Sequence, residues 1–222
     1  VVGFPTVACE MSDGNLAVGN HEGIVTIISP DGSIKESFEL DGKIIGLFQI
    51  GDNLIVGSSI SGIYGYSKEI IWSHELNSGC EIICLSGTEF LVADSSGTLF
   101  RFGSNGELLW EKELGQMTHI CSNTEGSFSA VALINGDFIM LNNYGEKIRD
   151  SQAASDDIEI ISSMIFRSSD ILVVSRNSLG MTIDDRPENR IECWSVKKGK
   201  IHTCEVDSLV NCITSTLSLI HI

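Results

Sequence analysis

The stretch Leu54-Ile-Val-Gly-Ser-Ser-Ile-Ser-Gly62 decides the fold, because it is one copy of a pattern that recurs along the chain. The pattern is an apolar run, a small residue, a short polar turn and a glycine. Further copies lie at residues 16–23, 91–97 and 130–136, and a fifth begins at Ile171. The small residues of the first four copies are 38, 36 and 39 residues apart, and that of the fifth follows after 43. A period near 40 residues indicates a repeat protein.

A second landmark has the same period. The segments Glu69-Ile-Ile-Trp72 and Glu107-Leu-Leu-Trp110 each follow a copy of the first pattern, and each is itself followed by Glu-Leu. Weaker versions end at Glu36, Arg149 and Thr203. Because Trp72 and Trp110 recur at matching places, we interpret both as residues that pack one repeat against the next rather than as ligand-stacking residues.

Each repeat reads as four short strands. In the second repeat, residues 43–50, 53–58, 63–66 and 69–76 are apolar, β-branched or alternating, and polar turns separate them. Glycine interrupts nearly every candidate helix, so we expect almost no helix. The repeated glycines are assigned to tight turns, since no phosphate-binding signature surrounds them. They are Gly23, Gly62, Gly97 and Gly136.

Units of this length with four antiparallel strands predict an all-β chain with the β-propeller fold, in which each small sheet is one blade. We count about five blades and the opening strand of a sixth, within a single domain over residues 1–216. We therefore expect a fragment of a larger ring. The expected blades are residues 9–41, 42–78, 79–115, 116–156 and 157–207, with a partial blade at 208–216.

The run Leu-Ile-Val-Gly-Ser, then Gly-Ile-Tyr and Ile-Trp, in the second repeat resembles the pyrroloquinoline-quinone-like (PQQ-like, or quinoprotein-like) propeller repeat. The WD40-like repeat is nearly as similar. The resemblance covers about residues 9–206. The chain departs from both families, because only Trp72 and Trp110 hold the late-strand tryptophan position, and the Gly-His and Trp-Asp dipeptides of WD40 repeats are missing.

Both ends of the sequence look unlike natural termini. Residues 217–222, Leu-Ser-Leu-Ile-His-Ile, resemble the translation of an adapter used in sequencing libraries. We assign this segment to a non-native tail and give it no weight. The first residue is Val1, and no signal peptide is visible in residues 1–9. We therefore expect an internal piece of a longer protein.

The composition narrows the possible partners. The chain has 222 residues, with 14 basic against 30 acidic side chains and a formal net charge of −16. This acidity argues against nucleic acid as a partner, because affinity for phosphate needs clustered Lys and Arg. No apolar run approaches the roughly 18 residues of a membrane span. The seven cysteines include no CxxC pair, which favours a reducing compartment, and we predict a cytoplasmic protein.

One connection is much longer than its counterparts, and we predict a binding role for it. It runs over residues 176–190 in the fifth blade, on the rim that usually holds the binding site of a propeller. A calcium site at its carboxylates lacks the usual ligand spacing, and the histidines form no zinc motif, so we expect no metal. The candidate binding residues are Arg176, Asp184, Asp185, Arg186, Glu188 and Arg190.

Two readings of the function belong to different classes. The chain lacks a nucleophile elbow, a metal cluster and a nucleotide loop, which favours a non-catalytic scaffold that binds another protein through one rim, without a cofactor. The alternative is a piece of a quinoprotein dehydrogenase. The resemblance implies that such an enzyme would bind the quinone with calcium and would carry adjacent cysteines, whereas Cys80 and Cys84 are four residues apart. A membrane-assembly scaffold of the quinoprotein-like type is a further possibility within the first class.

Overall fold

The computed structural model describes residues 3–153, 159–178 and 189–214. These residues form twenty strands in five four-stranded antiparallel sheets, and they contain no helix. No helix capable of crossing a bilayer is therefore found in them. The chain divides into two compact units, Val1–Gly115 with three sheets and Gln116–Ile222 with two. The all-β fold with four-stranded blades is confirmed.

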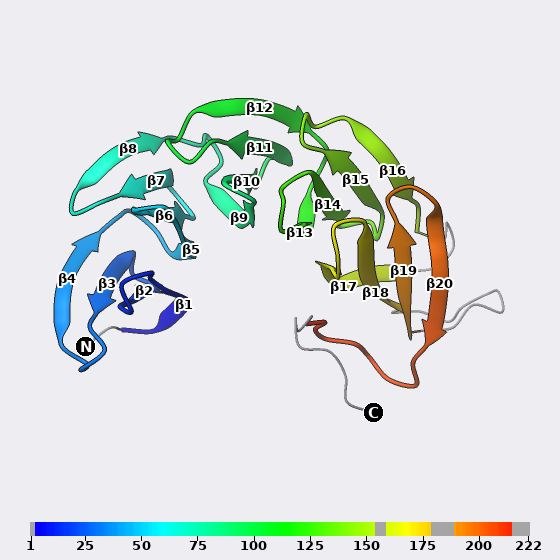
Figure 1. Cartoon of the computed structure of the whole chain (residues 1–222), viewed down its shortest axis with the longest axis horizontal. Coiled ribbons are helices and arrows are strands. Elements are labelled where there is room, and N and C mark those ends of the chain that lie inside the picture. The colour runs from blue at the N-terminus through cyan, green and yellow to red at the C-terminus, as the bar shows by residue number, and fades with distance from the viewer. Residues whose placement is uncertain (1–2, 154–158, 179–188, 215–222) are drawn as a thin grey trace. The chain divides into compact units, whose positions relative to one another are not determined.

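In the first unit each sheet consists of four strands that follow one another in the chain and pair with their neighbours (Figure 1). The strands are β1 (Pro5–Glu10), β2 (Leu16–Asn20), β3 (Ile24–Ile28), β4 (Ile34–Glu39), β5 (Ile44–Ile50), β6 (Asn53–Ser58), β7 (Gly62–Tyr66), β8 (Ile70–His74), β9 (Cys80–Ser86), β10 (Glu89–Asp94), β11 (Thr98–Phe102) and β12 (Leu108–Glu113).

The second unit repeats this plan twice. Its last sheet has the longer strands, because β17 and β18 contain eight residues each. The strands are β13 (Met117–Ser122), β14 (Phe128–Leu133), β15 (Phe138–Asn142), β16 (Lys147–Ser151), β17 (Glu159–Phe166), β18 (Ile171–Ser178), β19 (Asn189–Ser195) and β20 (Gly199–Glu205).

Burial follows the position of a strand within its sheet. In β6 and β10 every residue after the first is buried, whereas β12 alternates exposed with half-buried residues after its first position. A continuous apolar run is typical of a strand covered on both faces, and alternation is typical of a strand with one face in water. The sequence therefore distinguishes the covered second strand from the outer fourth strand.

Neighbouring sheets of the first unit bury their faces against each other. Phe38 of the first sheet stacks on Tyr66 of the second, with ring centroids 4.0 Å apart. Phe48 of the second sheet meets the edge of Phe90 of the third at 5.7 Å. Because a four-stranded sheet has two apolar faces, each sheet is stable only when a neighbour covers them.

The segment Glu69-Ile-Ile-Trp72 and two of its weaker versions each end in a residue that contacts the next sheet. Trp72 lies so close to Gly106 that a Cβ atom there would be 2.5 Å from the indole. In the second unit Arg149 donates from Nε to the carbonyl oxygen of Val196 at 2.6 Å. In the first sheet the corresponding residue is Glu36, and burial together with this carboxylate raises the pKa of Tyr66. Three different side chains thus join successive sheets.

The glycines assigned to turns share a left-handed backbone. Gly23, Gly62, Gly97 and Gly136 have φ values of 91°, 104°, 92° and 83°. Gly62 is also tightly packed, because a Cβ atom there would lie 2.3 Å from the carbonyl oxygen of His74. Both the conformation and the lack of space favour glycine at this position.

The partial sixth blade was predicted at residues 208–216, and residues 208–214, the part of it that the structure describes, form no strand. They lie along the fifth sheet, where Asn177 donates to the Val210 carbonyl at 2.9 Å and accepts from its N–H at 3.1 Å. The hydroxyl of Ser162, at a bulge in β17, donates to the same carbonyl. Thr6, at the matching bulge in β1, donates to the carbonyl of Ile44 at 2.6 Å. Residue 210 therefore occupies the place that the first strand of a following sheet takes elsewhere.

Candidate functional site

Two sets of turns lie on one rim of the sheets in each unit. The turn between the second and third strands of a sheet is hydrogen-bonded to a connection between sheets. That connection either follows the fourth strand of the same sheet or precedes its first strand. The N–H of Leu40 donates to Gly23 O, that of Leu114 to Gly97 O, and that of Ile134 to Gln116 O, each at 3.0 Å. We call this side the upper rim, and the side with the remaining turns the lower rim. The upper rim is the one predicted to carry the binding site.

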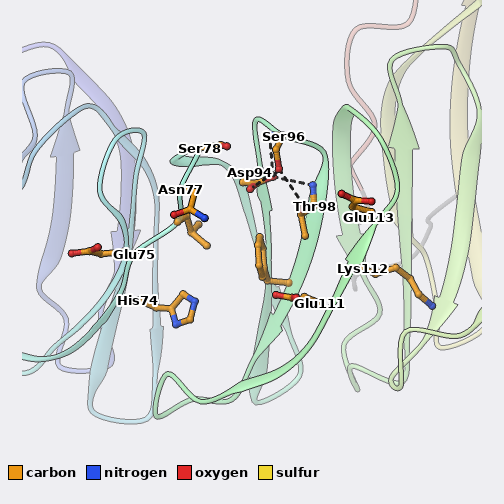
Figure 2. Close-up of a pocket in the computed structure, with 12 residues that line it drawn as sticks. His74, Glu75, Asn77, Ser78, Asp94, Ser96, Thr98, Glu111, Lys112 and Glu113 are labelled. Atoms are coloured by element: carbon orange, nitrogen blue, oxygen red, sulfur yellow. Dashed lines mark hydrogen bonds between the residues drawn. The ribbon is translucent and has the colours of Figure 1, made fainter.

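A cavity of about 650 Å³ opens at the upper rim between the second and third sheets. Its lining comes from the end of β8 and the connection after it, from β11 and the turn between β10 and β11, and from β12 (Figure 2). This volume falls within the usual range for ligand sites. The charged and aromatic residues of its lining are His74, Glu75, Asp94, Phe100, Glu111, Lys112 and Glu113. The side chain of Lys112, between the two glutamates of β12, extends away from the other labelled side chains in Figure 2.

Three exposed carboxylates line this cavity. Glu75 comes from one wall, and Glu111 and Glu113 come from alternate positions on the other. Within residues 3–153, 159–178 and 189–214, no Lys, Arg or His forms a salt bridge with any of them. Their negative charges are therefore available to a ligand.

Asp94 has a different role, although it lines the same cavity. It is 5% exposed, and its carboxylate accepts from the Ser96 hydroxyl at 2.7 Å and from the Thr98 N–H at 2.9 Å. These bonds, drawn in Figure 2, fix the turn between β10 and β11 that lines the cavity. Asp94 thus shapes the cavity, and its oxygens are already occupied.

Aromatic rings give the cavity an apolar portion. The His74 ring meets the edge of Phe102 with centroids 4.8 Å apart, and Phe100 lines the same space. Aliphatic stems of long cationic side chains pack well on such surfaces, while their charged ends pair with carboxylates. The arrangement suits the side chains of Lys or Arg in a bound peptide.

The described residues show no metal-binding group of three or more His, Cys, Asp or Glu side chains. All seven cysteines are free thiols in the structure. Burial, together with the nearby charges of Glu81 and Asp94, raises the pKa of the Cys80 thiol to about 12. That thiol is protonated near neutral pH and so is a poor nucleophile.

Two of the predicted binding residues lie inside the fifth sheet. The strands β18 and β19 extend to Ser178 and begin again at Asn189, so the connection is shorter at both ends than the predicted 176–190. Arg176 is 1% exposed and Arg190 6%. Their backbones pair directly across the two strands. Both side chains therefore point into the protein, and their role in binding stays a prediction.

The buried arginines form a network with two buried glutamates. Arg176 Nε lies 3.2 Å from a carboxylate oxygen of Glu192, and Arg190 Nη1 lies 2.6 Å from Glu159. Arg190 also pairs with Glu192 at 3.0 Å. Burial disfavours both charged forms, but the opposite charges outweigh it: the pKa of Glu192 is lowered and that of Arg190 is raised. The guanidinium of Arg176 also donates to Gly136 O at 2.6 Å, which ties the fourth sheet to the fifth.

The remaining predicted candidates, Asp184, Asp185, Arg186 and Glu188, lie outside the described residues. The cavity between the second and third sheets was not predicted. A signal for it was present, since Glu75 and Glu113 are the glutamates of the two Glu-Leu pairs that follow the tryptophan landmarks.

Comparison of the sequence with family models finds no match, and comparison with curated proteins finds none either. Solved structures do match. The WD40 domain of Pan2 from Neurospora crassa has a TM-score of 0.68 at 16% identity, over 95% of this chain and 68% of that one. The WD40 propeller domain of Doa1 has a TM-score of 0.66 at 12% identity, over 96% and 74%. The computationally designed Ika8 protein has a TM-score of 0.73 at 14% identity, over 96% and 65%.

These likenesses show the fold. The chain has the β-propeller fold of WD40 domains, as the resemblance to WD40-like repeats implied. The resemblance to quinoprotein-like repeats stays a prediction, and so does the adapter origin of residues 217–222. Identities of 12–16% carry no information on what this chain binds.

Proposed function

We propose that this protein is a non-catalytic scaffold that binds another protein through the upper rim, and that the cavity between the second and third sheets takes a basic segment of the partner. The observation that carries this proposal is the set of three exposed carboxylates around one cavity, Glu75, Glu111 and Glu113, none of which has an ion pair within the described part of the chain. Carboxylates accept hydrogen bonds and donate none, so the cavity selects groups with N–H donors and positive charge.

The overall charge supports the same kind of partner. A net charge of −16 attracts basic surfaces over a distance and raises the rate of encounter. The cavity then selects among basic partners by the spacing of their side chains. The WD40 type of fold is compatible with this role, because WD40 domains commonly act as interaction scaffolds.

The test measures the binding of a fluorescent peptide with the core sequence Lys-Arg-Lys by anisotropy. A triple variant, Glu75→Gln with Glu111→Gln and Glu113→Gln, removes the charges at the cavity. The matched control, Glu22→Gln with Glu69→Gln and Glu125→Gln, removes three exposed charges elsewhere. We expect the first variant to weaken binding at least about tenfold and the control to weaken it less than about twofold.

Equal weakening by the two variants would show that the peptide responds to net charge alone and would overturn the proposed site. The predicted loop forms a second part of the proposal. Shortening residues 179–188 is expected to reduce binding of the natural partner while leaving the peptide affinity unchanged, because the peptide contacts only the first unit.

A further inference from the structure

The outer edge of β12 carries two of the glutamates that line the upper-rim cavity. β12 is the last strand of the third sheet, so this edge pairs with no other strand of the described residues. On its inner side β12 pairs with β11, in the register Thr98↔Glu113 and Phe100↔Glu111. Paired residues place their side chains on the same face of a sheet, which is why Glu111 and Phe100 line the same cavity.

The register also shows which backbone groups of β12 point away from the sheet. In an antiparallel pair of strands, residues that exchange both hydrogen bonds with their partner alternate with residues that exchange none. The N–H of Leu114 donates to Gly97 O at 3.0 Å, so Leu114 lies at a bonded position. Lys112 is then bonded as well, whereas Glu111 and Glu113 direct their N–H and C=O groups to the outer edge. The two glutamates therefore present backbone donors and acceptors beside their carboxylates.

The spacing of the two glutamates matches that of an extended chain. Glu111 and Glu113 are alternate residues of one strand, so they lie about 7 Å apart on one face. In a second strand laid along the same edge, residues i and i+2 have the same spacing and reach the two carboxylates together. A helix instead brings residues three or four apart onto one face. The arrangement therefore favours an extended basic segment.

The outer strands of the other two sheets in the first unit differ at one of these positions. In all three sheets the glutamate of a Glu-Leu pair lies at, or just after, the end of the fourth strand. Two positions earlier, β12 has Glu111, whereas β4 has Ser37 and β8 has Ser73. The register places these three residues opposite equivalent residues of the third strand. Among these three outer strands, β12 alone has carboxylates at both outward positions.

We propose that the outer edge of β12 binds an extended segment of the partner protein as an additional antiparallel strand, with Lys or Arg at residues i and i+2 opposite Glu111 and Glu113. This inference rests on the proposed function, because it names the conformation and the spacing of the basic segment that the same cavity takes. Backbone hydrogen bonds to the edge supply affinity, and the paired charges supply selectivity. The basic side chains extend into the cavity, which Glu75 also lines.

A second copy of this chain fits the edge less well than another protein does. Its sequence has two places where basic residues stand two apart, Lys147 with Arg149 and Lys198 with Lys200. Arg149 already donates to a backbone carbonyl of the fifth sheet, and Lys200 lies 3.5 Å from the buried carboxylate of Glu192. One member of each pair is thus held by its own chain, so we expect the segment to come from a different protein.

The first experiment compares two fluorescent peptides of equal composition on the full chain by anisotropy, Thr-Lys-Thr-Lys-Thr and Thr-Lys-Thr-Thr-Lys. We expect the alternating peptide to bind at least about fivefold more tightly, because only its lysines reach both carboxylates from one extended strand. Equal affinity, or no binding of either at about 1 mM while the Lys-Arg-Lys peptide binds, would overturn the strand pairing and leave the proposed function intact. Failure of the Lys-Arg-Lys peptide to bind would overturn both.

Backbone methylation of the alternating peptide tests the pairing without changing any charge. In the proposed register the lysine N–H groups donate to β12, and the threonine N–H groups point away from it. N-methylation of both lysines should weaken binding at least about tenfold, whereas N-methylation of the last two threonines should weaken it less than about threefold. Equal effects of the two modifications, or the reverse order, would overturn the antiparallel pairing.

Amide hydrogen exchange, measured by NMR on the full chain, tests the same pairing from the protein side. We expect the alternating peptide to slow exchange of the Glu111 and Glu113 N–H groups at least about fivefold and to leave that of Lys112 unchanged. Glu111→Ser gives β12 the residue of the other outer strands and should abolish the preference for the alternating peptide. The matched control, Glu69→Ser, should keep that preference. Unchanged exchange at Glu111 and Glu113, or a preference that survives Glu111→Ser, would overturn the proposal.

Discussion

The third and fifth sheets have the same strand order, yet their interiors contain different chemistry. In the third sheet, Phe90 and Phe102 are fully buried, and their rings stack at 5.4 Å. In the fifth sheet, Arg176 and Glu192 are almost as deeply buried and form an ion pair. The same backbone arrangement thus accommodates either an aromatic core or a charged one.

The two interiors should respond differently to substitution. A hydrocarbon core loses stability in proportion to the volume removed, and neighbouring side chains partly relax into the space. A buried charge network is different, because removing one member leaves its partner charged, desolvated and unpaired. The comparison therefore predicts a graded response in the third sheet and a steep one in the fifth.

The largest expected effect is that of Arg176→Met. This change leaves Glu192 with fewer positive neighbours in a buried site, and we expect it to lower the free energy of unfolding of the second unit by about 3–5 kcal/mol. Urea unfolding, followed by the fluorescence of Trp194, measures the loss. The control is Lys147→Met, which removes an exposed pair with Asp150 and should cost less than about 1 kcal/mol. A loss for Arg176→Met no larger than that of the control would contradict the comparison.

A smaller effect is expected for Phe90→Leu in the third sheet. The change keeps an apolar side chain and removes part of its volume, so we expect a loss of about 1–2 kcal/mol in the same unfolding experiment, followed by Trp72. Phe4→Leu is the control, because Phe4 is 78% exposed and its substitution should have little effect. A loss above that of Arg176→Met would reverse the order and refute the distinction between the two interiors.

The smallest effect concerns pH. The pKa of Glu192 lies below its ordinary value of 4.5, since the Arg176 charge and the bonds from Trp194 and Arg190 outweigh the effect of burial. The stability from this group is present above pH 4.5 and is lost as the pH falls through the lowered pKa. The NMR signal of the Trp194 indole N–H, which donates to Glu192 at 2.9 Å, reports the titration. We expect its midpoint below 4.5 in the wild type and at a higher pH in Arg176→Met, and an unchanged midpoint would contradict the role of Arg176.

Much of the fold could be predicted because the same sequence pattern recurs in several repeats, and the recurrence removes the uncertainty about the secondary structure of any single copy. One copy of Leu-Ile-Val-Gly-Ser fits several structures, but copies at a period near 40 residues, with glycines where the chain must turn, favour one. The charged network could not be predicted. Arg176 lies between Ser175 and Asn177, and Arg190 follows Asn189, so both arginines have the polar neighbours of loop residues. Only the pairing register shows that they lie opposite each other and beside Glu192.

The upper-rim cavity could be predicted in part, less fully than the fold but better than the charged network. Glu75 and Glu113 repeat in the sequence, but Glu-Leu after an outer strand is also what a solvated strand end contains. What makes them a candidate site is the space between two sheets, which depends on how the sheets pack.

The contacts between successive sheets carry one more consequence, which concerns how such a chain can evolve. Glu36, Trp72 and Arg149 occupy matching positions but contact different neighbours. Glu36 contacts the Tyr66 phenol, Trp72 contacts the turn at Gly106, and Arg149 donates to the carbonyl oxygens of Val196 and Lys197. A repeat moved elsewhere in the chain would set an indole or a guanidinium against a surface shaped for another group. Duplication can lengthen such a protein while its repeats are still alike. Once the contacts between neighbouring sheets have diverged, each repeat fits only its own neighbours, and a change in the order of the repeats destabilises the fold.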